Sequence, residues 1–551
     1  MISEITLLGQ FRGKTSDGVT QFLGVKYASI RNRFADAEMI GYGEGDAILD
    51  ATEYGYDGSI YWAFPDVYIM KLTSKPSSDQ SLLLCLSGGF AESDLDCLNL
   101  NITLPAATSP ASKLPVFLFI HGGGLVTGAS SFPQYDMARF VKMSVQKGFP
   151  IIAVSINYRL GISGFLTSSE LREAGFKPNN GLRDQRVAIM WIQKHIGTFG
   201  GDDQNVTLAG MSAGAAAVTL HLQCSKQLFT RAIAMSGSYL MTQPLPYHAH
   251  EESYKQAIDA LGLANVTPEE RVTVLVNCPT HELYSKILPR VPVGFAVDGD
   301  LVPSEVAFPK TRSDMENGPP SRGNNCKDMM IGCAQMDASI CSLLTPHWKK
   351  DAAQNMNAAM RDVLKAHPIE AQEIFERYGL EKTMSDEVAF PAVLNFVNDV
   401  VALAPVVAFA RTWQGNLYAY YFNERNPWEG PWEGQASHIL DLAYLFQNYR
   451  EYLTEEQQAV AEAFAEDFLK FCHGVSPWPV VDETATKDTF PVRVFGPSDE
   501  GLTAKVDVRA YGGETMRRST VFDYADKISL DEMLMIVREF GVKASETLLA
   551  A

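Results

Sequence analysis

The sequence predicts an α/β fold: one mostly parallel, doubly wound sheet with helices on both faces. Two observations carry this prediction. Between residues 114 and 224, apolar segments of strand length alternate with segments whose apolar side chains recur at helical spacing, and glycines stand where the strand-like segments end. Such alternation is typical of parallel sheets, because a helix makes each crossover and covers a face. Neither a repeat nor a linker-like segment divides the 551 residues, so we expect a single domain over 1–551.

Each strand and helix of this unit has its own signature. The segment LPVFLFIHGGG predicts a buried strand at 116–120, and FPIIAVSINYRL predicts a second strand over the β-branched run 151–156. The segment DQRVAIMWIQKHIGTFG predicts a helix, because Val187, Met190 and Trp191 lie at helical spacing and glycines end it. The segments NVTLAG and MSAGAAAVTLHLQC predict a further strand with its helix, and DMMIGCA predicts a later strand.

Two regions are richer in proline and polar residues, near 240–325 and 345–435. We expect them to be helical insertions over the carboxyl edge of the sheet, where ligands bind in doubly wound folds. They also carry many aromatic residues, whose commonest role is core packing.

Composition and charge exclude several classes of partner. The chain is 46% hydrophobic and 20% charged, with a formal net charge of −19, and an acidic surface repels nucleic acids and anionic membranes. No stretch approaches about eighteen consecutive apolar residues, so a transmembrane span is not expected. The N-terminus lacks a basic segment followed by an apolar one, which favours a cytoplasmic protein, with secretion as the alternative.

The segment LAGMSAGAAA places Ser212 between Gly210 and Gly214, where an apolar strand becomes a helix. A nucleophilic serine on a strained strand-to-helix turn needs small neighbours, because strand and helix approach closely there. A small-residue turn at the start of a packed helix would have the same composition. The pattern alone therefore leaves both interpretations open.

A second glycine motif follows the first predicted strand. The segment HGGG covers 121–124, and backbone N–H groups without an obstructing Cβ can point there at one oxygen atom. A serine nucleophile needs such an oxyanion hole, together with a base and an orienting carboxylate. HGGG followed by G-x-S-x-G in this order favours catalysis over a simple turn of the chain.

These motifs belong to a wider resemblance. The chain is similar to the type-B carboxylesterase/lipase family, which includes the cholinesterases, in segments spread along the sequence: GVTQFLGVKYA, DLDCLNLNI, HGGG, NYRLGISGFL, NNGLRDQRVAIMWIQKHIGTFGGDDQNVTLAGMSAG, AIAMSGS and VDGDLVP. The resemblance implies the α/β-hydrolase fold and hydrolysis of carboxylic esters without a cofactor or a metal ion. It implies that Ser212 is the nucleophile and that the backbone N–H groups of Gly123, Gly124 and Ala213 form the oxyanion hole.

The resemblance also points to the base and the acid. His438 in GQASHILDLAYLF matches the family's catalytic histidine segment, and Asp337 in MMIGCAQMDASI matches the acidic triad position, which is usually Glu followed by Gly. The chain order Ser212, Asp337, His438 is the one expected of α/β-hydrolases. Ser236 in AIAMSGS matches a family serine that supports the acid.

Other ionisable residues have a simpler interpretation. Asp441 follows His438 by three positions, and we expect it to be structural. Histidines and cysteines show no zinc-like spacing, so no metal site is expected. The remaining candidates are interpreted as turn, loop or surface residues: Asp298, Asp300, His121, His248, His250 and His473.

Two departures from the cholinesterases bear on the substrate. Met211 precedes the nucleophile where cholinesterases have Glu, so the floor beside Ser212 is expected to be apolar and neutral. Cys85 and Cys97 resemble the family's first disulfide pair, which we expect to form only in a secreted protein, and the short loop between them has no tryptophan. A choline ester therefore loses both a negative charge and a cation–π platform. We expect uncharged, hydrophobic aryl or alkyl esters of short to medium chain to be better substrates.

Two alternatives to hydrolysis stay open. The same triad can pass its acyl group to an alcohol or amine, as in an acyltransferase or cyclase, because water is only one acceptor for an acyl-enzyme. The family also contains non-catalytic interaction proteins, which have typically lost the serine that this chain keeps. The partner that the sequence predicts is a small-molecule ester.

Overall fold

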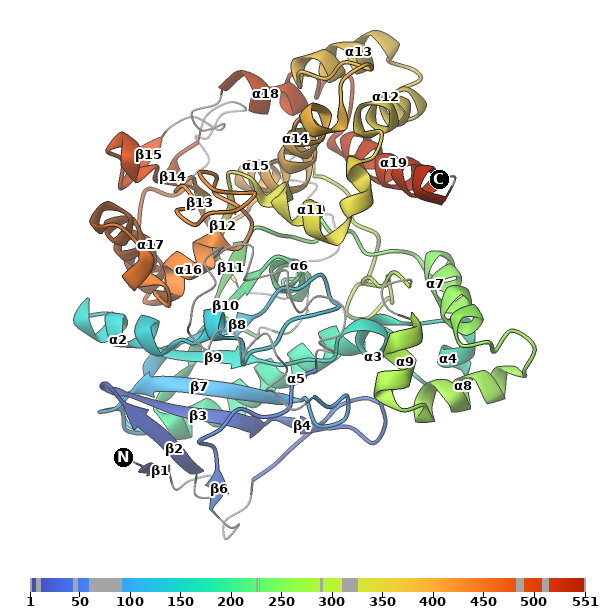
Figure 1. The fold of residues 1–551 in the computed structure, drawn as a ribbon. Coiled ribbons are helices and arrows are strands. Elements are labelled where there is room, and N and C mark those ends of the chain that lie inside the picture. The colour runs from blue at the N-terminus through green and yellow to red at the C-terminus, as the bar shows by residue number, and fades with distance from the viewer. Residues whose placement is uncertain are drawn as a thin grey trace.

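The predicted strands assemble into one large twisted sheet with helices on both faces, as a computed structural model shows (Figure 1). This arrangement is that of the predicted α/β class. The structure describes residues 2–5, 11–42, 48–58, 92–223, 226, 228–287, 291–309, 326–481, 490–507 and 515–549.

The whole sheet has thirteen strands among the described residues, and the strands in its middle are parallel. In the order β9-β8-β10-β11-β12-β13-β14, every neighbouring pair runs parallel. To within two residues, β8, β9 and β12 confirm the strands predicted at 116–120, 151–156 and 328–334. The ranges are β8 Leu114–Ile120, β9 Ile152–Ile156, β10 Gly201–Met211, β11 Arg231–Met235, β12 Asp328–Ala334, β13 Asn416–Phe422 and β14 Val492–Phe495.

Antiparallel strands, which the sequence did not single out, extend the sheet at both ends. On the N-terminal side they are β1 Ile2–Ile5, β2 Phe11–Ser16, β3 Val19–Lys26 and β7 Asn99–Pro105. At the other end β15 (Ala504–Asp507) pairs with β14. The thirteenth strand of the large sheet is β6, Leu49–Asp50, which pairs with β2. A separate small sheet is formed by β4 Ala28–Ser29 and β5 Glu38–Met39.

Alternate side chains of the central strands feed two separate hydrophobic cores. On β8, Leu118 and Ile120 belong to one core, whereas Phe117 and Phe119 belong to the core on the opposite face. Burial on both faces explains why these strands are continuous apolar runs. The helices of the first core include α5 Asn180–His195 and α6 Ala213–His221, and those of the second are α2 Ala138–Gln146, α16 Leu440–Phe446 and α17 Glu455–Cys472.

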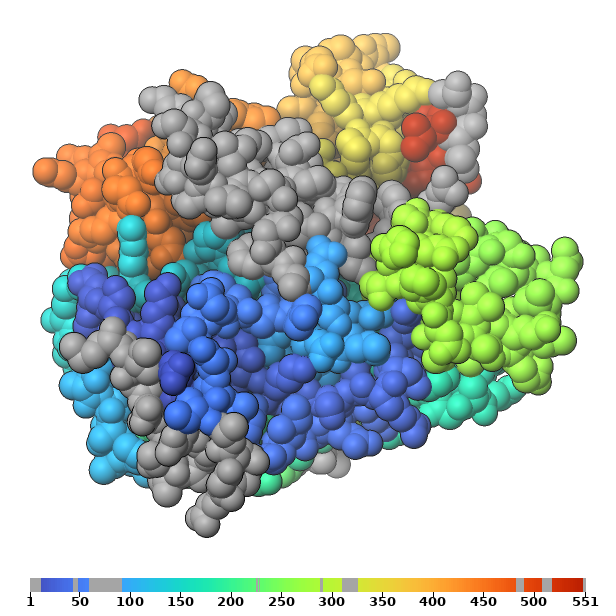
Figure 2. Space-filling model, turned by 60° about the horizontal axis from the view of Figure 1, so that its bottom comes forward, coloured from blue at the N-terminus to red at the C-terminus, as the bar shows by residue number. Residues whose placement is uncertain are grey.

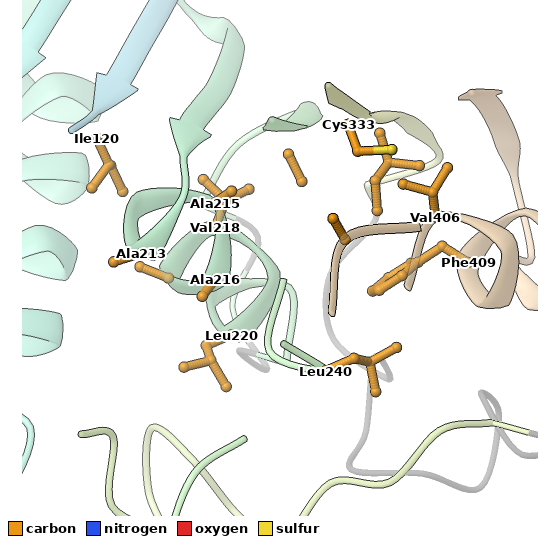
Figure 3. Close-up of a cluster of buried hydrophobic side chains, with 14 of the residues drawn as sticks. Ile120, Ala213, Ala215, Ala216, Val218, Leu220, Leu240, Cys333, Val406 and Phe409 are labelled. Carbon is orange, nitrogen blue, oxygen red and sulfur yellow. The ribbon is translucent and has the colours of Figure 1, made fainter. Parts of the chain in front are cut away.

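Helix α6 packs closely because its first turns are built from small residues. Ala213, Ala215 and Ala216 are buried in one cluster with Val406 and Phe409 of the helix α15, Ala404–Thr412 (Figure 3). Protein interiors are close-packed, so a larger side chain there would push the helix away from the strand that precedes it.

A helical layer stands over one end of the sheet (Figure 1). The second insertion was expected over 345–435, and this range is too long. It includes β13, Asn416–Phe422, which is a strand of the central sheet. The helices of the layer are α11 Cys341–Leu344, α12 Ala352–Val363, α13 Pro368–Arg377, α14 Asp386–Asn398, α15 Ala404–Thr412, α18 Thr515–Asp523 and α19 Leu530–Leu549.

In the first expected insertion, 240–325, the described residues form the helices α7, α8 and α9. This part of the chain makes up a lobe at the side of the molecule (Figure 2). This lobe shares a small core of its own with the short helices α3 and α4. The ranges are α3 Gly161–Phe165, α4 Ser169–Glu173, α7 Tyr247–Ala260, α8 Pro268–Asn277 and α9 Thr280–Ile287.

One helical run, Asp386–Thr412, is long and apolar enough to cross a membrane by length and composition alone. Of its apolar window, 83% is buried inside the protein, which is the pattern of a core helix. The run consists of α14, a π turn at Asp399–Leu403, and α15.

Candidate active site

Ser212 lies at the junction between β10, which ends at Met211, and α6, which begins at Ala213. Its φ of +56° and ψ of −122° are rare for a residue with a Cβ. Holding such a conformation costs on the order of 1–3 kcal/mol. The backbone supports it, because the Ser212 N–H donates a hydrogen bond to the Met235 carbonyl oxygen at 2.9 Å. This is the strained strand-to-helix turn expected around a nucleophilic serine.

The glycines around Ser212 are required by close backbone contacts. A Cβ on Gly210 would come within 2.4 Å of the Gly214 carbonyl oxygen, and a Cβ on Gly214 within 2.2 Å of the Ile120 carbonyl oxygen. A Cβ on Gly237 would come within 2.3 Å of the carbonyl oxygen of Ser212 itself. The G-x-S-x-G pattern therefore lets β10, α6 and the end of β8 approach one another, which a turn rich in small residues for flexibility alone would not require.

The HGGG loop presents unpaired backbone N–H groups beside this turn. A Cβ on Gly122 would lie 2.9 Å from the Ser212 Cβ, so the loop and the serine are neighbours. Gly123 and Gly124 have φ values of +116° and +61°, which favour glycine. Within the described part of the chain, the N–H groups of Gly123, Gly124 and Ala213 have no acceptor. They are therefore free to bind an anionic oxygen.

His121 holds the HGGG loop in place through contacts of its ring and of its carbonyl oxygen. Its Nδ1 lies 2.8 Å from the Gly122 carbonyl oxygen, and the Tyr158 hydroxyl donates to the His121 carbonyl oxygen at 2.9 Å. Burial lowers the pKa of His121 to about 4, so the ring is neutral near pH ~7. This agrees with its interpretation as a loop residue.

Asp337 and His438, far apart in sequence, come together at the carboxyl ends of the strands. Asp337 follows β12, and its Oδ1 lies 2.8 Å from His438 Nδ1. Its Oδ2 accepts a hydrogen bond from the Ala334 N–H at 2.8 Å, and the His438 N–H donates to Ser339 Oγ at 2.9 Å. His438 Nδ1 must donate to the carboxylate, so Nε2 carries the lone pair. Among the described residues His438 Nε2 has no hydrogen-bond partner.

The register of the sheet explains why these residues gather. Met211 pairs with Met235 and Met235 with Gly332, so Ser212 and the end of β12 lie along the same edge. An isolated bridge between Met336 and Ser437 then sets the histidine segment beside the acid loop. The structure contains no hydrogen bond between the Ser212 hydroxyl and the His438 imidazole, and such bonds often tighten only when substrate is bound.

The support expected from Ser236 is not made through a hydrogen bond. Ser236 is buried, and its N–H donates to the Gly332 carbonyl oxygen at 2.8 Å. Its hydroxyl has no partner among the described residues, whereas the second oxygen of Asp337 is taken by Ala334. Aspartate is one methylene shorter than the glutamate usual at this position, and its own loop satisfies it instead.

Comparisons with known proteins agree with this geometry. A sequence model of the Carboxylesterase family matches residues 2–489. Lipase 1 of Yarrowia lipolytica is 27% identical over 492 residues, which cover 87% of this chain and 88% of the lipase. The acetylcholinesterase of Bungarus fasciatus is 31% identical over 477 residues, which cover 80% of this chain and 72% of that enzyme.

The chain belongs to the carboxylesterase family. Among solved structures, a PNB esterase matches it with a TM-score of 0.70 and 23% identity, over 95% of this chain and 99% of the esterase. The predicted α/β-hydrolase fold is therefore confirmed. The expectation of an enzyme from a family of carboxylic-ester hydrolases is confirmed as well.

Two buried residues beside the triad positions of this carboxylesterase differ in charge. Met211 is fully buried in the core that also holds Phe119 and Ile439, so a neutral side chain stands next to Ser212. Asp441 is also fully buried, and burial together with the charge of Asp337 raises the pKa of Asp441 to about 7. It accepts a hydrogen bond from the Tyr420 hydroxyl at 3.4 Å.

The rival acids of the segment VDGDLVP occupy a turn, as expected. Asp298 accepts hydrogen bonds from the N–H groups of Asp300 and Val302, at 3.0 and 2.8 Å. Both carboxylates also pair with Arg183. His250 and His473 contact backbone carbonyl oxygens away from the triad.

A cavity of about 680 Å³ has His438, but not Ser212, among the residues that line it. Its wall combines the acid loop, α14 and the segment that precedes the histidine, and it includes the ion pair Lys349–Glu387 at 2.6 Å. Asn398, Ser339 and this cavity were not identified from the sequence. The apolar side chains of the wall include Ile340, Leu343, Phe390, Leu394, Trp432 and Ile439.

Two further expectations concern metals and cysteines. Over the described ranges, no group of three or more His, Cys, Asp or Glu side chains is placed to hold a metal ion. Cys97 is buried, whereas Cys85 lies outside the described residues. The predicted disulfide between the two therefore lies outside the described residues as well.

Proposed function

We propose that this carboxylesterase is a serine hydrolase that cleaves carboxylic esters through an acyl-enzyme. The observation that carries the proposal is the 2.8 Å contact between Asp337 and His438 Nδ1, which leaves the lone pair of Nε2 without a partner in the described chain. An imidazole that a carboxylate orients through Nδ1 is what a serine nucleophile needs as its base. The strained conformation of Ser212 supports its role as that nucleophile.

The reaction then runs in two halves. Ser212 Oγ attacks the ester carbonyl carbon while His438 Nε2 takes the hydroxyl proton, and the N–H groups of Gly123, Gly124 and Ala213 bind the oxyanion. The bond to the alcohol oxygen breaks, and the proton on Nε2 passes to the departing alcohol. A water molecule repeats these steps on the acyl-enzyme, releasing the acid and free Ser212. Removing one oxyanion donor typically costs on the order of 10²–10³ in rate.

The substrate class that fits this site best is the uncharged, hydrophobic ester. The cavity beside His438 combines apolar and polar side chains, and the neutral Met211 before Ser212 is buried in the adjacent core. Each methylene of substrate that becomes buried contributes up to ~0.8 kcal/mol. A cationic choline group finds no carboxylate at position 211, where it would otherwise be stabilised.

A fluorophosphonate probe tests the catalytic role. Such a probe reacts covalently with an activated serine, so it should label the folded wild-type protein and not Ser212→Ala. Absence of label on the native protein, or equal labelling of the variant, would overturn the proposal. Analysis of the products with and without an added alcohol separates hydrolysis from acyl transfer, because a hydrolase yields the free acid in both cases.

The substrate class is tested by a pair of esters with the same acyl group. We expect kcat/KM for a p-nitrophenyl ester to exceed that for the choline ester of equal acyl length. If the choline ester is the better substrate, the reasoning from Met211 and the apolar side chains of the cavity is wrong.

A further inference from the structure

Asn398, the last residue of α14, holds both sides of the loop that carries Asp337. Its side chain is buried, with 1% exposed. The amide oxygen Oδ1 accepts a hydrogen bond from the Ala338 N–H at 3.2 Å, and the amide nitrogen Nδ2 donates to the Gln335 carbonyl oxygen at 3.1 Å. These two backbone groups flank Asp337 in sequence. One side chain therefore fixes the chain both before and after the acid, and we call this pair of contacts the amide clamp.

The chemistry of the clamp requires an amide. A backbone N–H needs an acceptor and a carbonyl needs a donor, and asparagine offers the two on separate atoms, which the single hydroxyl of threonine does not. Turning the amide over would set N–H against N–H and oxygen against oxygen, so the two contacts fix its orientation. With alanine at 398, the Ala338 N–H would lose the acceptor it has in the described chain. Leaving a buried polar group unpaired is destabilising, and a shift of the loop can relieve it.

The clamp matters because other contacts hold mainly the first half of the loop. The Gln335 N–H donates to the Phe422 carbonyl oxygen at 3.0 Å, and the Met336 N–H donates to the Ala436 carbonyl oxygen at 2.9 Å. After Asp337, the backbone is tied to the surrounding structure by the Ala338 contact with Asn398, next to the contact between Ser339 and His438. The position of the acid relative to the imidazole thus depends on α14.

The end of α14 is shaped to reach the loop. Directly after Asn398 the helix passes into the π turn Asp399–Leu403, and the Asp399 N–H is shared between the carbonyl oxygens of Asn395 and Phe396. Single π turns inside helices frequently occur at functional sites, because they change the direction of nearby side chains. Earlier turns of the same helix line the cavity beside His438.

We propose that Asn398 is a positioning residue, which keeps Asp337 at hydrogen-bonding distance from His438 Nδ1. This role rests on the proposed function, in which Asp337 orients the base. Loosening the clamp should slow turnover without weakening substrate binding, since no atom of the clamp contacts the reacting groups. A misplacement of about 1 Å can cost as much as 10²-fold in rate.

The test compares two variants at this position with a matched control. Asn398→Ala removes the whole clamp, and Asn398→Asp keeps the volume and the acceptor but loses the donor. Asn179→Ala is the control, because Asn179 is equally buried and clamps Ala296 in the same way, accepting from its N–H at 2.8 Å and donating to its carbonyl oxygen at 2.9 Å. Asp337→Asn reports whether the acid is catalytic at all. For each variant, kcat, KM, the rate of fluorophosphonate labelling and Tm are measured.

We expect both Asn398 variants to lose about 10-fold or more in kcat and in labelling rate, with KM unchanged to within about twofold. Asn179→Ala should lower Tm at least as much, because Asn179 also donates to Asp298 and has a φ of +58°, but it should keep kcat to within about twofold. Wild-type kcat in either folded Asn398 variant, or an equal loss of kcat in Asn179→Ala, would overturn the positioning role of Asn398. The proposed function would still stand. Wild-type kcat in Asp337→Asn would overturn the proposed function, and the role of Asn398 with it.

Discussion

Replacing Gly237 with alanine measures how tightly the backbone around Ser212 is held. The φ of Gly237 lies outside the left-handed region, so alanine meets no conformational penalty there. Its Cβ, however, would lie 2.3 Å from the Ser212 carbonyl oxygen and 3.1 Å from the Ser212 Cα, whereas ordinary contacts begin at 3.4 Å. The atoms in the way belong to the backbone and have no rotamer to escape to. The serine must therefore move by about 1 Å, which can cost as much as 10²-fold in kcat.

Gly197→Ala is the matched control, because a Cβ there meets only the tip of Lys113, at 3.9 Å. We expect Gly237→Ala to lose about 10²-fold in kcat and in fluorophosphonate labelling, and Gly197→Ala to keep both to within about twofold. Near-ultraviolet circular dichroism shows whether each variant is folded. A folded Gly237→Ala enzyme with wild-type kcat would refute the idea that the backbone contact fixes the serine.

Three other substitutions test the pocket and the buried charge. Met211→Glu should raise kcat/KM for a choline ester relative to the neutral ester of equal acyl length, and an unchanged ratio would contradict this. Leu394→Trp should fill the cavity and lower kcat/KM for esters of bulky alcohols by about 10-fold, which corresponds to roughly two buried methylenes. The kcat/KM for methyl esters should stay the same, and an equal loss for both kinds of ester would contradict this prediction. Because the pKa of Asp441 is raised to about 7, its contribution to stability is present in acid and is lost as the pH rises through about 7. Asp441→Asn should therefore raise Tm near pH ~8 more than near pH ~4, and a pH-independent difference would argue against it.

The central parallel strands could be predicted from sequence because burial on both faces makes them continuous apolar runs. The antiparallel strands at the ends of the sheet give weaker signals, since β2 has the burial pattern of a strand that is half exposed. The strand β13 was included in an expected insertion, although NLYAYYF is rich in the aromatic residues that strands favour. The strand lies between the helices α15 and α16, and it was assigned with α15 to one helical insertion.

Some residues of the site could likewise be predicted from the sequence, and others could not. Ser212 and the HGGG loop have local signatures, because strained turns and close backbone approach demand glycine wherever they occur. The contact between Asp337 and His438 depends on two separate loops, and only the resemblance to a family suggested it. Asn398 lies with Asn395 and Asp399 among otherwise apolar residues in AVLNFVNDVVALA, and this pattern could not say which of the three would hold the loop of the acid.

The shorter acid gives these contacts a common logic. An aspartate reaches one methylene less far than glutamate, so the loop that carries it must come closer to the imidazole to keep the 2.8 Å contact. The hydroxyl of Ser236, which would support a longer acid, has no partner among the described residues. Asp337 instead takes its second hydrogen bond from its own loop, and Asn398 ties that loop to α14. In this chain the carboxylate is therefore held by the backbone that precedes it, and Asn398 holds the loop on both sides of the acid.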